Sequence, residues 1–312
     1  MTNAVVSEQQ SRLPRHLLAP RHWPSWLAVG ILWCIAQLPY RLAIRTGEAL
    51  GMLLYPVIPR RRHVVLVNLS LCFPDLSAAE RRALARKNFR YTGRMLIEMA
   101  LSWWAPASRL PALAHFQGLE HWQAARDTGR GVLLIGGHFT SMEMAARLTG
   151  LQGEFDVMYR RNDNPVFQYL TALYRDRHYG AAIPRGDIRT LVRRLRQGHS
   201  VWYAPDQDYG RRHAVFAPFF GVPAATIAAT SRIARLSGAV VLLTTYHGRD
   251  DASGYDLVFL PPLENYPTDN PLTDATRINQ FFEEAIRQAP EQYFWAHRRF
   301  KTRPDSADPS PY

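Results

Sequence analysis

A histidine and an acid five residues apart form the clearest chemical signal in this sequence. They are His138 and Glu143, in the segment HFTSME. An imidazole takes up a proton near neutral pH, and a carboxylate beside it fixes the imidazole tautomer and stabilises the imidazolium. No serine or cysteine nucleophile accompanies them in a recognisable motif. The pair therefore predicts a general base, His138, that acts on an incoming hydroxyl group and is oriented by Glu143.

The position of the pair in the chain matters more than its spacing, because His115 and Glu120 are spaced in the same way. Residues five apart in a continuous helix lie about 140° apart around its axis, so their side chains diverge. His138, however, directly follows the apolar run 131–137 and precedes a helical pattern, so the chain turns before Glu143. Ligand sites of open α/β sheets lie at such strand ends, and the first N–H groups of a helix can face an oxyanion. This context favours His138; the competing interpretation is a histidine satisfied within the core.

The elements around this pair alternate between strand and helix patterns. Short apolar runs predict strands at 131–137, 156–160, 201–205, 239–246 and 255–260. Helical patterns lie near 141–149, 165–179, 187–197, 224–236 and 273–288. Earlier in the chain, Ser77 and Glu80 form a capping box at the start of a long helix that reaches Trp104. This alternation predicts an α/β fold with a mixed, mostly parallel sheet flanked by helices.

An uncharged segment, 23–40, lies near the N-terminus. As a helix rising about 1.5 Å per residue it reaches roughly 27 Å, close to a hydrocarbon core of about 30 Å. Trp23 and Tyr40 at its ends are typical of membrane interfaces, and the arginines at 60–62 suit anionic headgroups. These features predict a single N-terminal membrane-anchoring helix; a buried core helix is the alternative. The chain then divides into an anchor with its basic flank (1–65), a catalytic domain (66–304) and a disordered tail (305–312).

The composition limits the classes of function. The chain has 312 residues, and its net charge of +12 implies an anionic partner. Only Cys34 and Cys72 are present, which excludes a disulfide-rich scaffold and a four-cysteine zinc site. The sequence contains no phosphate-binding GxxxxGK[ST] loop, no GxSxG elbow and no HExxH motif. A basic nucleic-acid-binding protein would leave the uncharged segment unexplained, and no recognition motif supports it.

Seven blocks, in order along nearly the whole chain, resemble a known family. They are HVVLVNLSLCFPDLS (63–77), NFRYTGRMLIEMALSWW (88–104), GGHFTSMEMAAR (136–147), YRRNDNPVF (159–167), VWYAPDQDYG (201–210), VFAPFFGVPAAT (215–226) and PEQYFWAHRRFKTRP (290–304). The sequence is similar to the late lipid A acyltransferases, the lauroyl/myristoyl group within the HX4(D/E) glycerophospholipid-type acyltransferases.

The resemblance implies an O-acyltransferase that moves a fatty acyl chain from acyl carrier protein to a hydroxyl of the hydroxyacyl chains of Kdo2-lipid IVA, the lipid A precursor. It implies a location on the cytoplasmic face of the inner membrane, no metal, no organic cofactor and no nucleic acid. Two alternatives stay open: an acyl-CoA-dependent lysophospholipid or glycolipid acyltransferase, which normally carries an FPEGTRS-like block that is missing here, and a non-catalytic basic membrane scaffold.

The resemblance also implies roles for residues after later strands. In the YRR block, Arg160 or Arg161 would bind a phosphate of the acceptor, since a guanidinium fork matches phosphate oxygens; the competing role is an ordinary surface salt bridge. Asp206 and Asp208 match the PDQDYG block, where Asp206 would position the acceptor or hold an active-site arginine. A metal site is the competing interpretation, for which two acids without a nearby histidine are weak evidence.

Two basic clusters are candidate docking sites for the acidic acyl carrier protein. Arg189, Arg193 and Arg196 form a stripe along one predicted helix, and Arg298 and Arg299 belong to the basic segment near the C-terminus. A solvated helix face is an equally good interpretation of the stripe.

Overall fold

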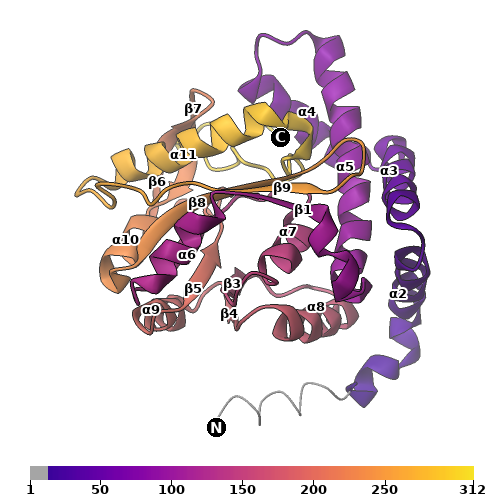
Figure 1. Cartoon of the computed structure of the whole chain (residues 1–312). Helices are drawn as coiled ribbons and strands as arrows, with labels where there is room; N and C mark the ends of the chain where they lie inside the picture. The colour runs from indigo at the N-terminus through magenta and orange to yellow at the C-terminus, as the bar shows by residue number, and fades with distance from the viewer. Residues whose placement is uncertain (1–12) are drawn as a thin grey trace.

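The computed structural model describes residues 13–312 and shows a twisted sheet surrounded by helices (Figure 1). The strands are β1 (Ala114–Gln117), β2 (Val132–Ile135), β3 (Asp156–Tyr159), β4 (Ala182–Pro184), β5 (Ser200–Tyr203), β6 (Ala214–Phe219), β7 (Val222–Ile227), β8 (Val240–Gly248) and β9 (Tyr255–Phe259). The α-helices are α2 (Trp23–Ala36), α3 (Tyr40–Val57), α4 (Pro59–Cys72), α5 (Ala78–Trp104), α6 (Leu119–Asp127), α7 (Met142–Thr149), α8 (Pro165–His178), α9 (Ile188–Arg196), α10 (Ala229–Ser237) and α11 (Pro271–Gln288). Short 3-10 turns occupy Arg15–Leu18, Pro20–His22, Ala107–Arg109, Pro111–Leu113 and Pro290–Gln292.

The seven-stranded sheet has the order β1-β9-β8-β2-β5-β3-β4. All its pairings are parallel except β8 with β9, so the expectation of a mixed, mostly parallel sheet is confirmed. The central strand β2 is buried on both faces and pairs with β5 on one side and β8 on the other. The carboxyl ends of β2 and β5 therefore lie next to each other, at the same end of the parallel strands.

The structure also contains a two-stranded sheet that the sequence patterns do not predict. The segment 224–236 was predicted to be helical, but β6 and β7 form an antiparallel hairpin through Ile227, and helix α10 begins only at Ala229. The hairpin turn uses Phe220 and Gly221, both with positive φ. Gly221 adopts this conformation without strain, so the second residue of the turn suits the reversal of the chain.

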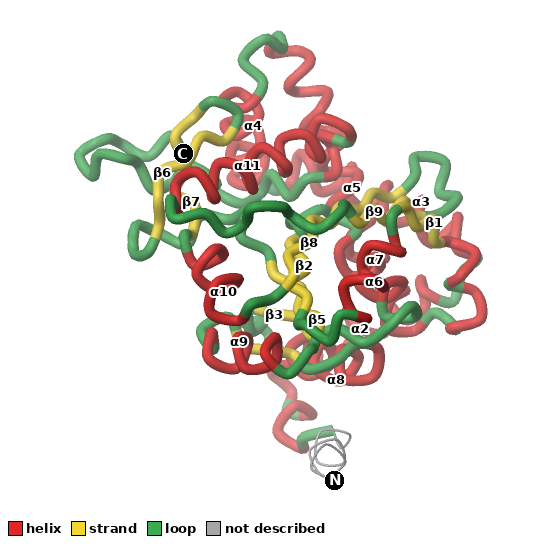
Figure 2. The backbone as a smooth tube through the Cα atoms, turned by 60° about the vertical axis from the view of Figure 1, so that its left-hand side comes forward, coloured by secondary structure: helices red, strands yellow, loops and turns green. Residues whose placement is uncertain are grey.

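Alternate residues of β2 belong to different hydrophobic clusters, one on each face of the sheet. Leu133 and Ile135 pack into the main core, which also receives side chains of α5, α7 and α11. Val132 and Leu134 pack into a smaller cluster around Trp122 of α6. The sheet is thus covered by helices on both faces, and Figure 2 shows these layers from a second direction.

The N-terminal segment is not one continuous helix. Helix α2 ends at Ala36, and α3 starts at Tyr40 after Pro39, whose fixed φ and missing N–H favour a break there. No helix in residues 13–312 is both long and apolar enough to cross a membrane. The first twelve residues of the expected anchor segment lie outside the described part of the chain.

Helix α3 is instead held against the body of the protein. Gly51 of α3 and Gly93 of α5 face each other so closely that a Cβ on Gly51 would lie 2.0 Å from the carbonyl oxygen of Phe89. Figure 1 shows α2 and α3 following each other along one side of the molecule.

At the other end of the chain, Tyr312 packs back onto the protein: its hydroxyl accepts a hydrogen bond from the backbone N–H of Phe300 at 2.9 Å.

Candidate active site

His138 is held by Asp206, a residue that lies at the end of the neighbouring strand. The Nδ1 atom of His138 lies 2.6 Å from Oδ1 of Asp206, and the backbone N–H of His138 donates to Oδ2 at 2.8 Å. The hydroxyl of Tyr293 donates to the same Oδ2 at 3.0 Å. These contacts direct the Nδ1–H of His138 to the carboxylate, which leaves Nε2 as the basic nitrogen.

The environment of Asp206 keeps its carboxyl group ionised. Asp206 is only 1% exposed, whereas 25% of the His138 side chain is exposed. Burial acts to raise the pKa of Asp206, but the adjacent His138 and the hydrogen bonds from His138 and Tyr293 lower this pKa below its ordinary value. A buried carboxylate in this position can stabilise an imidazolium that forms on His138.

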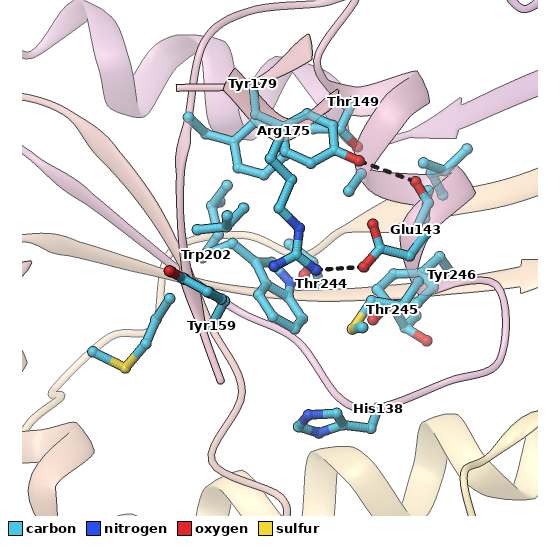
Figure 3. A pocket seen from close by; sticks show the side chains of 18 of the residues that line it. His138, Glu143, Thr149, Tyr159, Arg175, Tyr179, Trp202, Thr244, Thr245 and Tyr246 are labelled. Carbon is cyan, nitrogen blue, oxygen red and sulfur yellow. Dashed lines mark hydrogen bonds and ion pairs between the residues drawn. The ribbon is translucent and has the colours of Figure 1, made fainter. Parts of the chain in front are cut away.

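Glu143 has a different partner from the one predicted. It lies in the first turn of α7, and its carboxylate pairs with the guanidinium of Arg175 on α8 (Figure 3). Among residues 13–312, no hydrogen bond joins Glu143 to His138; the structure gives the orienting contact to Asp206. The reason is geometric, since Asp206 approaches from the adjacent parallel strand, while α7 directs Glu143 toward α8.

An apolar cavity of about 230 Å³ opens beside His138. Glu143, Arg175 and Trp202 line the part nearer His138, and Thr149 and Tyr179 lie at the far end in Figure 3. The remaining wall consists mainly of aliphatic and aromatic side chains, including Leu134, Met142, Ala145, Ala146, Phe155, Val157, Leu257 and Phe259. The shape and lining suit an alkyl chain better than a sugar or a peptide.

A wide basic groove of about 1620 Å³ meets this cavity at His138. His138, Tyr159, Arg160 and Trp202 line both spaces. The cationic side chains of the groove are Arg160, Arg185, Arg189, Arg193, Arg196, Arg212, Arg232, Arg235 and Lys301. Its acids are Asp208, which is buried, and Asp269, which pairs with Arg235. The base therefore stands where an apolar space and a cationic space join.

The predicted phosphate-binding and acidic residues have different surroundings. Arg160 lies at the junction of the two spaces, and its Nη2 is 3.3 Å from Oδ2 of the exposed Asp163. Arg161 is exposed and lines neither space. Asp208 is buried and accepts hydrogen bonds from the backbone N–H and the hydroxyl of Thr302, so its carboxylate holds the C-terminal segment instead of facing a substrate. No group of three or more potential metal ligands occurs within the described residues.

Of the arginines predicted to dock the carrier protein, some are accessible and one is buried. Arg189, Arg193 and Arg196 line the groove, although Arg196 donates two hydrogen bonds to the carbonyl of Leu236. Arg298 is exposed. Arg299, in contrast, is 1% exposed and donates to the carbonyl oxygen of Ala225, so it cannot contact a partner protein.

Sequence reasoning missed Tyr293 and Arg175, which no local motif marks. Tyr293 is far along the chain from Asp206, and Arg175 belongs to an ordinary amphipathic helix. In the sequence, Tyr293 is marked only by its position in PEQYFWAHRRFKTRP, one of the seven segments that resemble the family.

His297, beside this site, gives the first testable prediction. It accepts a hydrogen bond from the backbone N–H of Asp208, and burial lowers its pKa to about 4. Because the unfolded chain has a pKa of about 6.5, His297 adds stability at neutral pH that is lost as the pH falls from about 6.5 toward 4. We expect wild-type protein to lose about 2 kcal/mol through this group between pH ~7.5 and ~5.

Denaturant unfolding of His297→Gln at both pH values checks this, since glutamine keeps an acceptor but does not titrate. The variant should lose correspondingly less stability on acidification than the wild type. An identical acid loss in both proteins would show that His297 is not held neutral.

Comparison with known proteins places the chain in a family. The model of the family described as bacterial lipid A biosynthesis acyltransferase matches residues 11–302. The lipid A biosynthesis lauroyltransferase of Escherichia coli is 42% identical over 297 residues, covering 95% of this chain and 97% of that protein. The palmitoleoyltransferase of the same organism is 40% identical, covering 95% and 96%, and the myristoyltransferase is 31% identical, covering 91% and 88%.

A solved structure, the 1-acyl-sn-glycerophosphate acyltransferase PlsC from Thermotoga maritima, matches at 12% identity with a TM-score of 0.37, covering 79% of this chain and 97% of that one. This likeness is too distant to inform the site. The extent of the family match and the full-length identity of the relatives agree with each other: the chain belongs to the bacterial lipid A biosynthesis acyltransferases.

Proposed function

We propose that this lipid A acyltransferase takes a fatty acyl chain from acyl carrier protein and transfers it to a hydroxyl on the hydroxyacyl chains of Kdo2-lipid IVA. The observation that carries the proposal is that His138, held by the buried Asp206, lies at the junction of an apolar cavity and a basic groove. The acyl chain is apolar and the acceptor is a phosphorylated glycolipid, so the two spaces match the two substrates in chemistry.

The reaction uses His138 as its base. Nε2 of His138 takes the proton of the acceptor hydroxyl while the oxygen attacks the thioester carbonyl carbon. The carbon–sulfur bond of the resulting tetrahedral intermediate then breaks, and the thiolate receives the proton from His138. Asp206 keeps the ring in the correct tautomer and stabilises the imidazolium between these steps.

Mass spectrometry of lipid A tests this function. In cells that lack their own late acyltransferases, the wild-type gene should add one fatty acyl chain to the lipid A precursor, and a His138→Ala gene should add far less. An unchanged lipid A in cells that produce folded, membrane-bound wild-type protein would contradict the proposal.

The donor side of the proposal predicts a docking surface on the basic groove. Arg189 and Arg193 on α9 present guanidinium groups along a groove that leads to His138. An acidic carrier protein would be attracted there by charge. We expect Arg189→Glu with Arg193→Glu to raise the KM for the acylated carrier protein at least about tenfold at low salt, and to weaken the dependence of KM on salt.

The matched control is Arg82→Glu, since Arg82 is exposed on α5 and lines neither space. It should leave KM within a few fold. A normal KM in the α9 variant would show that the carrier protein does not dock on α9. A raised KM in Arg298→Glu would indicate docking at the C-terminal segment instead.

A second surface supports attachment to the cytoplasmic face of the inner membrane. The larger apolar side chains that are strongly exposed on α2 and α3 are Trp23, Leu27, Ile31, Trp33, Leu42, Met52, Leu53 and Val57. Aromatic and aliphatic side chains on helices that lie along the protein body suit insertion into the headgroup boundary. In this proposal α2 and α3 rest in the membrane interface.

We expect the triple change Leu27→Gln, Ile31→Gln and Leu53→Gln to release most of the protein from anionic vesicles. Each leucine or isoleucine contributes about 1.5 kcal/mol or more when it is removed from water. Vesicle sedimentation in high salt measures the effect. The control Leu151→Gln with Leu272→Gln changes exposed leucines outside these helices and should sediment like the wild type; equal release by both sets of changes would refute the assignment.

A further inference from the structure

The ion pair between Glu143 and Arg175 places a positive charge within the apolar cavity. The two side chains are only 16% and 14% exposed, and both line the cavity that His138 also lines. We propose that Arg175 is a catalytic residue that stabilises the oxyanion of the tetrahedral intermediate, and that Glu143 is a positioning residue that holds the Arg175 guanidinium. This inference rests on the acyl transfer proposed above.

Arg175 has hydrogen-bonding capacity that the protein does not use. A guanidinium carries five N–H donors, and the carboxylate of Glu143 engages Nη2. The Nε atom of Arg175 is buried and has no hydrogen-bond partner among residues 13–312. Because Nε is closed off from the cavity, the donors that can meet a substrate are the N–H groups of Nη1, which make no hydrogen bond to residues 13–312 and are not fully buried.

The charge of Arg175 is secured at the same time. Burial acts to lower the pKa of Arg175, but the carboxylate of Glu143 together with Tyr179 and Tyr159 outweighs this effect, and the pKa lies above its ordinary value. The guanidinium carbon also lies 5.7 Å from the centre of the Tyr159 ring. The group is thus a largely buried cation at an apolar-lined cavity, where electrostatic stabilisation is stronger than in water.

The direction of the side chain fits this role. Figure 3 shows Arg175 extending from α8 into the cavity, with its guanidinium beside Glu143 and Trp202 and on the side that leads to His138. An acyl chain that fills the far end of the cavity near Thr149 brings its thioester carbonyl back toward this region. The carbonyl oxygen can then face Arg175 while the carbonyl carbon faces the hydroxyl activated by His138.

The chemical step balances. As the acceptor oxygen bonds to the thioester carbon, the π electron pair of the carbonyl moves to its oxygen, and the hydroxyl proton moves to Nε2 of His138. An N–H of Arg175 donates to the oxyanion. The carbonyl then re-forms, the carbon–sulfur bond breaks, and the proton passes from His138 to the sulfur. Asp206 thus serves the base, whereas Glu143 serves the oxyanion donor.

Steady-state kinetics of Arg175→Met test the inference. Loss of one oxyanion donor typically lowers kcat about 10²–10³-fold, and we expect that loss with KM for both substrates within a few fold. Arg175→Lys should recover part of the rate, because lysine keeps the charge but not the planar fork. Glu143→Gln should lower kcat by less, and the double variant should be no slower than Arg175→Met, because the two residues act as a unit.

The control is Arg194→Met. Arg194 makes a two-point pair with the buried Asp156, lines neither space, and should keep kcat within a few fold when it is replaced. If Arg175→Met fails to fold, Arg175→Ala with added guanidinium ion provides the readout, and recovery of kcat with guanidinium but not with sodium supports the inference. A normal kcat in Arg175→Met would overturn the inference. So would a double variant whose loss in kcat equals the product of the losses in Glu143→Gln and Arg175→Met, because the two residues would then act independently. Wild-type protein without transfer activity would instead refute the proposed function.

Discussion

Replacing His138 with alanine is expected to lower kcat for acyl transfer by at least about a hundredfold. General-base assistance contributes about 10²–10⁴-fold, and among the histidines of residues 13–312 only His138 lines both the cavity and the groove. Thermal unfolding of the purified variant checks that it is folded, since Asp206 keeps its hydrogen bonds from the backbone N–H of residue 138 and from the hydroxyl of Tyr293. Initial rates with acylated carrier protein and Kdo2-lipid IVA measure the effect.

His115 is the matched control, since Glu120 follows it at the same spacing as Glu143 follows His138. Both His115 and Glu120 are exposed, and neither lines the cavity or the groove. His115→Ala should therefore keep kcat within a few fold. Comparable losses in the two variants, or full activity without His138, would show that His138 is not the base.

Replacing Asp206 with asparagine is expected to cause a loss of about 10³–10⁴-fold in kcat. Removal of the charge that orients a catalytic histidine costs about this much in a triad, because the wrong tautomer is then favoured. Asparagine keeps the shape of the side chain but cannot stabilise the imidazolium. The variant that combines Asp206→Asn with His138→Ala should be no slower than His138→Ala, because a base and its orienting group act as a unit.

Asp256→Asn is the corresponding control. Asp256 makes a two-point pair with Arg249 at the end of the β8–β9 hairpin, outside both spaces. The same chemical change at this position should leave kcat within a few fold. A rate for Asp206→Asn near that of the wild type would mean that His138 does not depend on this carboxylate.

The sequence was sufficient to place His138 at the end of a strand, because the signals for that position are local. A continuous apolar run predicts a buried strand, and the glycines that follow allow the chain to turn toward α7. The same reasoning placed Asp206 at the end of a strand. The contact between them could not be predicted, because it requires that β2 and β5 be neighbours in the sheet, and strand order depends on long-range packing.

Glu143 shows the opposite case, in which a local pattern was correct about position but not about contact. The helical pattern at 141–149 placed Glu143 correctly in the first turn of a helix. Its partner Arg175 comes from α8, and no local signal indicates which of the chain's many arginines will reach it. The prediction of one continuous helix over residues 23–40 was wrong for a local reason. Pro39 interrupts this uncharged segment, although its hydropathy is continuous.

A single-turnover transfer experiment tests the central claim most directly. Purified protein is mixed in excess with carrier protein that bears a labelled acyl chain and with Kdo2-lipid IVA, and the label is followed in donor, acceptor and free fatty acid. We predict that wild-type protein moves the label to the acceptor as an ester, while His138→Ala and Asp206→Asn move it at least about a hundredfold more slowly. Label that stays on the carrier with the wild type, or that moves equally fast with His138→Ala, would contradict the account.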